Sequence, residues 1–191
     1  MKDMIKMVVV LSLFCGLSGL TLSTVRQATS ARIEEQVMTY VQGPALAQIF
    51  TGYDNNPIKD RKTFDLPDGK VTVFPAMKDG KLLGVALETF GKGFGGPVGI
   101  MVGFNTDGSQ LIGIGTTTLK ETPGLGMRLV EPAYRDQFRG HTTKAVELTK
   151  NGGDITAIAG ATISSTGSVA AVNDAIKIFN QIKDKIHATW S

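Results

Sequence analysis

The stretch DITAIAGATISSTGS, residues 154–168, organises the rest of the sequence. We expect its first residues to be extended and the chain to turn through Gly160-Ala161. Behind the stretch, apolar residues recur at gaps of three and four, which is the spacing of one helical face. The pattern therefore predicts a long amphipathic helix whose buried stripe consists of Val169, Val172, Ile176, Phe179, Ile182 and Ile186.

A row of hydroxyls lies at or just before the N-terminus of this helix, at Thr162, Ser164, Ser165 and Thr166. Unpaired N–H groups and the positive end of the helix dipole favour an anion at such a place. The alternative is a plain N-terminal cap, in which one of the last three hydroxyls closes the helix and Gly160 turns the chain. On this stretch alone both interpretations remain open.

Upstream, the hydrophobic pattern has the period of two that is typical of strands. Tight-turn signals at residues 78–81 and 105–108 predict hairpins, and thus an antiparallel sheet. The many glycines, 23 in all, indicate strong curvature or close backbone approach to a ligand. No GxGxxG follows a strand and no Walker motif is present, which disfavours Rossmann and P-loop sites. The expected strands are residues 71–74, 82–90, 97–104, 110–117 and 145–149.

The N-terminal segment has the length of a membrane span. Residues 7–25 carry no charge, and these 19 residues just cross a hydrocarbon core of about 30 Å. A cleaved signal peptide is the main alternative, because Ala28 and Ala31 offer a small-residue cleavage site. We favour a retained anchor, followed by a helix over residues 26–42 that Gly43-Pro44 interrupts, a further turn at 45–50 and a polar loop at 52–62.

Composition excludes several classes of function. The net charge of +3 comes from scattered Lys and Arg, so no nucleic-acid partner is expected. Cys15 is the only cysteine, so no disulfide forms within the chain and no cysteine-based metal site is expected. His141 and His187 lack ligand spacing, and no nucleophile–base pair is visible. We therefore predict neither a metal site nor catalytic residues.

Two glycine-rich loops suggest a flat ligand. Residues 91–97, GKGFGGP, are either a flexible connector or a backbone wall that a ring can approach, because glycine adds no Cβ. Residues 119–126, LKETPGLG, contain the type II turn signal Thr122-Pro123-Gly124. A structural turn explains the proline and the glycine but leaves the neighbouring Glu121 unexplained.

These three segments together resemble the FMN-binding domain shared by RnfG and NqrC, subunits of membrane-bound, ion-pumping electron-transfer complexes. GATIS resembles the GAT-x-S/T motif of that family, GFGGP its G-Y/F-G-G-P motif, and LKETPGLG its H-x-E-T-P-G-L-G motif. The motifs occur in the family's order, and the resemblance runs from about residue 70 to the C-terminus. Thr156 stands where the family has an acidic residue, and Leu119 where it has histidine.

The resemblance implies an α+β fold: a single N-terminal transmembrane helix, then an antiparallel curved sheet flanked by helices. It implies one covalent FMN, which a flavin transferase attaches from FAD through a phosphoester to Thr162. The chain would thus be a flavoprotein and a phosphoprotein. An ionised Glu121 beside the flavin ring would lower its potential. The other residues implied around the cofactor are Gly95, Gly96, Thr122, Leu125, Gly126, Gly160, Ala161 and Ser164.

The resemblance also implies a place in the cell and a set of partners. The chain would be a single-pass protein of the cytoplasmic (inner) membrane, with its soluble domain on the extracytoplasmic, periplasmic side. The other Rnf subunits would be its partners, and oxidoreductase activity would belong to the complex. The expected parts are an N-terminal tail (1–6), the anchor (7–25), a linking helix and loop (26–62) and the FMN-binding domain (63–191).

Within this family the length favours the G subunit of an ion-translocating ferredoxin:NAD oxidoreductase of the Rnf type. The C subunit of a sodium-translocating NADH:quinone oxidoreductase is the nearest alternative, and it is usually longer. A stand-alone extracytoplasmic flavin reductase would need a second catalytic domain. An anchored, non-redox binding or scaffold domain, in which the GAT turn is only a cap, is the remaining alternative.

Overall fold

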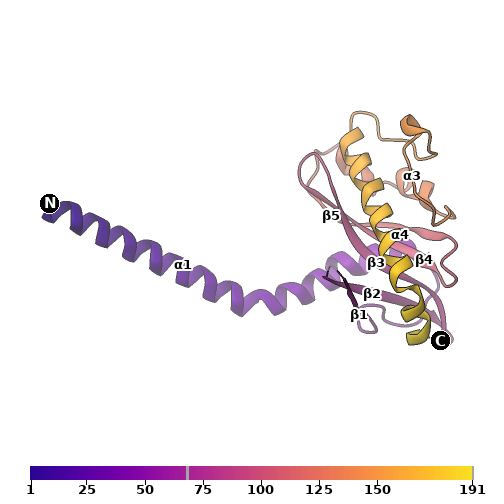
Figure 1. Cartoon of the computed structure of the whole chain (residues 1–191), viewed down its shortest axis with the longest axis horizontal. Helices are drawn as coiled ribbons and strands as arrows, with labels where there is room; N and C mark the ends of the chain where they lie inside the picture. Colours follow the sequence, from indigo (N-terminus) through magenta and orange to yellow (C-terminus); the bar gives the residue numbers. More distant parts are fainter. Residues whose placement is uncertain (68, 191) are drawn as a thin grey trace. The chain divides into compact units, whose positions relative to one another are not determined.

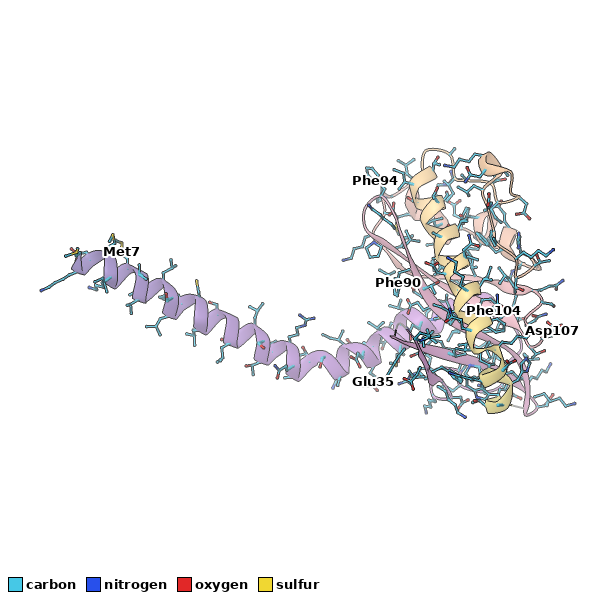
Figure 2. All side chains as sticks on the ribbon, viewed as in Figure 1. Met7, Glu35, Phe90, Phe94, Phe104 and Asp107 are labelled. Carbon is cyan, nitrogen blue, oxygen red and sulfur yellow. The ribbon has the colours of Figure 1, made fainter. Side chains whose placement is uncertain are left out.

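The computed structural model describes residues 1–67 and 69–190 and separates into two compact units, Met1–Met38 and Thr39–Ser191 (Figure 1). The first unit is the helix α1 (Lys2–Val37), which buries none of its residues. Its side chains project on all sides, as Figure 2 shows around Met7. Among the described residues, the helix that begins at Lys2 is the one that is long and apolar enough to cross a membrane.

The second unit begins within a π-helical turn, η1 (Met38–Gln42), which continues directly into α2 (Gly43–Ile49). The expected interruption at Gly43-Pro44 is wrong, because the backbone stays helical through both residues. Pro44 lies in the first turn of α2. It has no N–H with which to complete the ladder of the preceding turn, and a π turn is one way in which a helix accommodates such a gap.

The core of this unit is a five-stranded antiparallel sheet in the order β1-β2-β3-β4-β5. The four strands expected between residues 71 and 117 are confirmed as β2–β5, and both expected hairpin turns join them. Asp79 and Gly80 have φ of 50° and 73°, the backbone of a two-residue hairpin turn. Sequence patterns missed β1. The strands are β1 (Lys62–Leu66), β2 (Gly69–Lys78), β3 (Lys81–Lys92), β4 (Pro97–Asn105) and β5 (Leu111–Leu119).

Helices cover both faces of the sheet. The long helix α4 (Thr162–Trp190) packs across β3 and β4 (Figure 1), and its expected apolar stripe is buried there. At the centre of this face, the rings of Phe104 and Phe179 stack with centroids 4.3 Å apart. The opposite face is covered by α2, whose Leu46 and Ile49 join a second buried cluster. The expected α+β architecture is therefore confirmed.

The segment between β5 and α4 consists of short turns: η2 (Gly126–Val130), α3 (Pro132–Arg135), η3 (Asp136–Phe138) and η4 (Thr149–Asn151). The strand expected at residues 145–149 is wrong. Only Leu148 makes a bridge, to Ile155. The side-chain amide of Asn173, on α4, accepts from Val146 N–H (2.7 Å) and donates to Val146 C=O (2.9 Å), and so replaces a neighbouring strand.

The first turns of α4 lie unusually close to the end of β3. A Cβ built on Gly167 would lie 2.5 Å from the carbonyl oxygen of Lys92, and one built on Gly91 would overlap the carbonyl oxygen of Gly167. Both contacts are with backbone, which cannot move aside as a flexible side chain can. This approach fixes the start of α4 against the loop that follows β3.

We predict that Gly167→Ala destabilises the protein by about 1–3 kcal/mol, because the new methyl overpacks the contact with Lys92. Helix propensity alone predicts the opposite sign, a gain of up to about 1 kcal/mol. The free energy of unfolding from urea titration decides between them. Ala170→Gly, at an exposed position of the same helix, calibrates the propensity effect. A stabilised Gly167→Ala protein would contradict the close contact.

Candidate functional site

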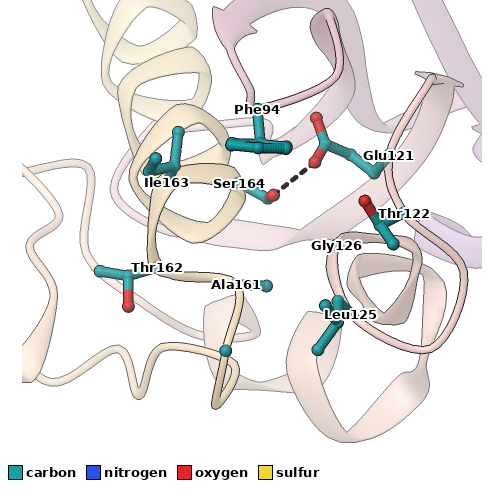
Figure 3. Close-up of a pocket in the computed structure, with 10 residues that line it drawn as sticks. Phe94, Glu121, Thr122, Leu125, Gly126, Ala161, Thr162, Ile163 and Ser164 are labelled. Atoms are coloured by element: carbon teal, nitrogen blue, oxygen red, sulfur yellow. Dashed lines mark hydrogen bonds between the residues drawn. The ribbon is translucent and has the colours of Figure 1, made fainter.

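Three segments that are distant in sequence meet at one end of the sheet (Figure 3). They are the loop between β3 and β4, the segment that follows β5, and the start of α4. Phe94 in the first of these loops and Asp107 after β4 lie at opposite ends of β4 (Figure 2). The three segments surround a cavity of about 350 Å³, a size typical of a small-molecule site. It is lined by Phe94, Glu121, Thr122, Leu125, Gly126, Gly160, Ala161, Thr162, Ile163 and Ser164.

The carboxylate of Glu121 holds the three segments together. Its side chain is buried, at 7% exposure. One oxygen accepts a hydrogen bond from Ser164 Oγ (2.6 Å), and the other accepts from the N–H of Gly95 (3.1 Å). Gly126 packs against it so closely that a Cβ there would lie 2.5 Å from Glu121 Oε2. The glutamate that turn chemistry left unexplained is thus the link between the loops.

The hydroxyls at the start of α4 fall into two groups. Those of Ser164, Ser165, Thr166 and Ser168 all donate to protein acceptors, whereas no described residue hydrogen-bonds the hydroxyl of exposed Thr162. Figure 3 shows this hydroxyl pointing away from the Ser164–Glu121 pair. The acceptors of the engaged hydroxyls are Glu121 for Ser164 (2.6 Å), Ala161 C=O for Ser165 (3.0 Å), Thr162 C=O for Thr166 (2.8 Å) and Ser165 C=O for Ser168 (2.9 Å).

The backbone around Thr162 suits an anion. Gly160 has φ of +78°, and Ala161 N–H closes the turn on Ile158 C=O (2.9 Å), so Thr162 becomes the first residue of α4. The first turn of this 29-residue helix contains no acidic side chain. Its free N–H groups and the helix dipole therefore favour negative charge beside the Thr162 hydroxyl.

Exposed apolar side chains surround the opening of the cavity. Phe94 is 73% exposed, Ile163 54% and Leu125 42%. In Figure 3, Phe94 and Leu125 reach the cavity from different loops. Large apolar groups that are this exposed and lie together around a cavity indicate a surface that a ligand or partner covers.

The structure brings together eight of the ten residues expected at the site, which all line this cavity. Gly95 and Gly96 do not line it. Gly95 acts through its N–H on Glu121, and Gly96 lies beside the side chain of Lys120. Sequence reasoning did not select Phe94 and Ile163 as site residues. An aromatic residue inside a glycine-rich loop was the available signal for the first of them.

The two positions that depart from the family motifs have structural partners. Leu119 is partly buried against the core below the site. The backbone of Thr156 pairs with the side chain of Gln137, which accepts from its N–H (2.7 Å) and donates to its C=O (3.3 Å). The segment that leads into Gly160 is therefore held in an extended form by a side-chain amide.

Beneath the start of α4 lies a buried hydroxyl pair. Tyr134, at 3% exposure, places its OH 2.6 Å from Ser168 Oγ. Burial raises the pKa of Tyr134 above its ordinary value of 10.0, and hydrogen bonds with Ser168 and Ser165 oppose this in part. The phenol therefore stays protonated and packs as a neutral group behind the site.

Comparison with known proteins agrees with this geometry. The family model described as "FMN-binding domain" matches residues 93–177, which include all three loops. The G subunit of the ion-translocating oxidoreductase complex of Shewanella piezotolerans is 31% identical over 97% of this chain and 93% of its own. The chain belongs to this family of G subunits. The expected family is thus confirmed.

Other members of the same family show the same relation. The G subunit of the ion-translocating oxidoreductase complex of Methanosarcina acetivorans is 27% identical, covering 92% of this chain and 94% of the relative. The G subunit of a proton-translocating ferredoxin:NAD(+) oxidoreductase complex of Clostridium ljungdahlii is 26% identical over 87% and 86%. Among solved structures, NqrC of Shewanella oneidensis has a TM-score of 0.56 at 22% identity, covering 70% of this chain and 71% of that one. This last likeness shows the fold.

We predict that Glu121→Ala lowers the free energy of unfolding by about 1–3 kcal/mol, because two buried donors lose their acceptor. The amide of Gly95 should also exchange faster with deuterium. Glu131→Ala is the matched control, because it removes a half-exposed ion pair with Arg128 and should cost at most about 1 kcal/mol. Equal losses in the two variants would contradict a linking role for Glu121.

A second prediction follows from the raised pKa of Tyr134. The folded protein holds this proton more tightly than the unfolded chain, so the resulting stability is complete below about pH 10 and is lost as pH rises through the raised pKa. Tyr134→Phe should flatten the fall in free energy of unfolding between pH 8 and 11. Tyr40→Phe, at an exposed position, should leave the slope unchanged.

Proposed function

We propose that this chain is the electron-carrying G subunit of a membrane-bound, ion-translocating oxidoreductase complex of the Rnf type. We further propose that it carries one FMN, joined by a phosphoester to Thr162. The observation that carries the proposal is the single unengaged hydroxyl at the N-terminus of α4, beside a cavity with an apolar opening. The match to an FMN-binding domain supports the choice of cofactor.

The residues present fit such a group. The helix N-terminus favours the phosphate, and the cavity of about 350 Å³ offers space for part of the ring. Phe94 and Leu125 supply the exposed apolar surface that a flat aromatic system covers. Bound FMN supplies a centre that accepts and releases one or two electrons, and the protein holds and tunes it. Glu121 holds the loops that form the cavity wall.

The attachment step balances with FAD as donor. The hydroxyl oxygen of Thr162 forms a bond to the phosphorus on the FMN side of the pyrophosphate, and the bond from that phosphorus to the bridging oxygen breaks. AMP leaves with the bridging oxygen, and the proton of the hydroxyl is released. A flavin transferase is the partner that we propose for this step, since the described residues near Thr162 form no catalytic base of their own.

The N-terminal unit supports the proposed location. We propose that residues 7–25 span the cytoplasmic membrane after the short tail 1–6, that 26–62 link the anchor to the domain, and that 63–191 form the FMN-binding domain on the extracytoplasmic side. The segment after the span contains no cysteine, which agrees with that side. The other subunits of the complex are the proposed membrane partners.

A non-redox scaffold domain is the alternative from a different class. In that case the hydroxyls at the helix start would serve only as caps. The engaged hydroxyls of Ser164, Ser165 and Thr166 are consistent with such a role, but the free hydroxyl of Thr162 caps nothing. The C subunit of a sodium-translocating quinone reductase shares the fold, whereas the curated relatives described above are G subunits.

We predict that wild-type protein co-produced with a flavin transferase shows a fluorescent band on a denaturing gel, and that intact mass increases by one FMN residue. Thr162→Val should abolish both signals, because valine keeps the shape but has no hydroxyl. Ser164→Ala is the matched control and should still carry the flavin. Fluorescence that persists in Thr162→Val would refute Thr162 as the attachment point, and an unmodified wild type would favour the scaffold alternative.

A further inference from the structure

The turn that presents Thr162 is closed from behind by one buried side chain. Ser165, at 0% exposure, places its Oγ 3.0 Å from the N–H of Ile158 and 3.0 Å from the C=O of Ala161. It accepts the first hydrogen bond and donates the second. These two partners are the first and last residues of the turn through Gly160.

We propose that Ser165 is a positioning residue for the hydroxyl of Thr162, an inference that rests on the proposed attachment of FMN. Thr162 follows Ala161 directly, so its Cβ and hydroxyl are placed by the backbone that Ser165 holds. Ser165 itself does not line the cavity. It acts through the turn and does not contact the reacting atoms.

The turn needs such support because little else within it does the same work. Gly160 adopts a left-handed φ of +78° and contributes no side chain to packing, apart from a close approach to Leu125. One backbone bond, Ala161 N–H to Ile158 C=O, closes the turn itself. Without the hydroxyl of Ser165, the N–H of Ile158, whose residue is 8% exposed, would lose its acceptor. A buried donor without an acceptor is unfavourable, so the turn would shift to satisfy it.

Displacement of the turn matters more for transfer than for folding. Attack on phosphorus requires the hydroxyl oxygen to lie in line with the leaving group, and a shift of about 1 Å can cost about 100-fold in rate. The loss of one hydrogen-bonding side chain is a modest effect on the stability of the fold by comparison. The two effects can therefore be separated.

Ser168 offers a matched control. It is the same residue type on the same helix, it is also 0% exposed, and its hydroxyl likewise bonds to backbone, at Ser165 C=O (2.9 Å). Its second partner is Tyr134, and it makes no contact with the turn. Removal of the Ser168 hydroxyl thus tests the cost of losing a buried serine in this helix without releasing the turn.

The experiment uses full-length protein in detergent, produced without flavin, to which a purified flavin transferase and FAD are added. The initial rate of covalent FMN incorporation is followed by in-gel fluorescence and its endpoint by intact mass. We expect Ser165→Ala to incorporate FMN about 10- to 100-fold more slowly than wild type. Ser168→Ala should incorporate it at a rate close to that of wild type, and Ser165→Thr, which keeps the hydroxyl, should restore much of the rate.

A second measurement reports on the turn without the transferase. Deuterium exchange at the amide of Ile158 should accelerate in Ser165→Ala and stay slow in Ser168→Ala. If Ser165→Ala loses its cooperative thermal transition, Ser165→Cys replaces it, because a thiol keeps the volume and is only a weak hydrogen-bonding group.

Wild-type incorporation and exchange in Ser165→Ala, in a wild-type protein that loads normally, would overturn the positioning role and leave the proposed function standing. A similar slowing of incorporation in Ser168→Ala and Ser165→Ala would also overturn it, because general weakening of the helix would then explain the result. A wild type that takes up no FMN would instead refute the proposed function, and the positioning role with it.

Discussion

The site depends on a single buried carboxylate, because the loops that form it have almost no core of their own. Glu121 joins a donor 26 residues before it, Gly95, to a donor 43 residues after it, Ser164. A buried acceptor with two good donors is stable, and a donor left without it is not. The glycines around the carboxylate follow from this arrangement, because at Gly93 and Gly126 a Cβ would occupy the space of Glu121. The glycine-rich sequence of these loops is thus a packing requirement as much as a source of flexibility.

The sheet and its two covering helices supply the rigid base for these loops. Close backbone contact between Gly91 and Gly167 fixes the first turns of α4 against β3, and from there the hydroxyls face either the loops or solvent. On the other face of the sheet, Arg139 donates to the carbonyl oxygens of Gln48 (2.7 Å) and Ile112 (3.2 Å). This arginine ties the end of α2 to the segment between β5 and α4. Both faces of the sheet therefore contribute to the placement of one end.

Local pattern was sufficient for the elements that bury a regular stripe, and it failed where a distant side chain replaces a regular partner. The period of α4 and the turn residues Asp79-Gly80 predicted a helix and a hairpin that the structure contains. The segment around Val146 is apolar and β-rich, yet it is not a strand, because Asn173 satisfies its backbone. In the site, spacing identified the hydroxyls, but which of them is free depends on tertiary contacts such as that of Ser164 with Glu121. Such contacts have no periodic signature in the sequence.

This division of the hydroxyls supplies a physical basis for selecting one residue among several of the same chemistry. A hydroxyl that already donates to a buried acceptor must give up that bond to react, and the acceptor is then left unsatisfied. Ser164, Ser165 and Ser168 are each buried and engaged, so each would incur that cost as well as the cost of leaving the core. Thr162 incurs neither, and it lies where the helix N-terminus favours a phosphate. The fold can thus direct modification to one position by occupying the alternatives, without a sequence-specific contact at the reacting hydroxyl itself.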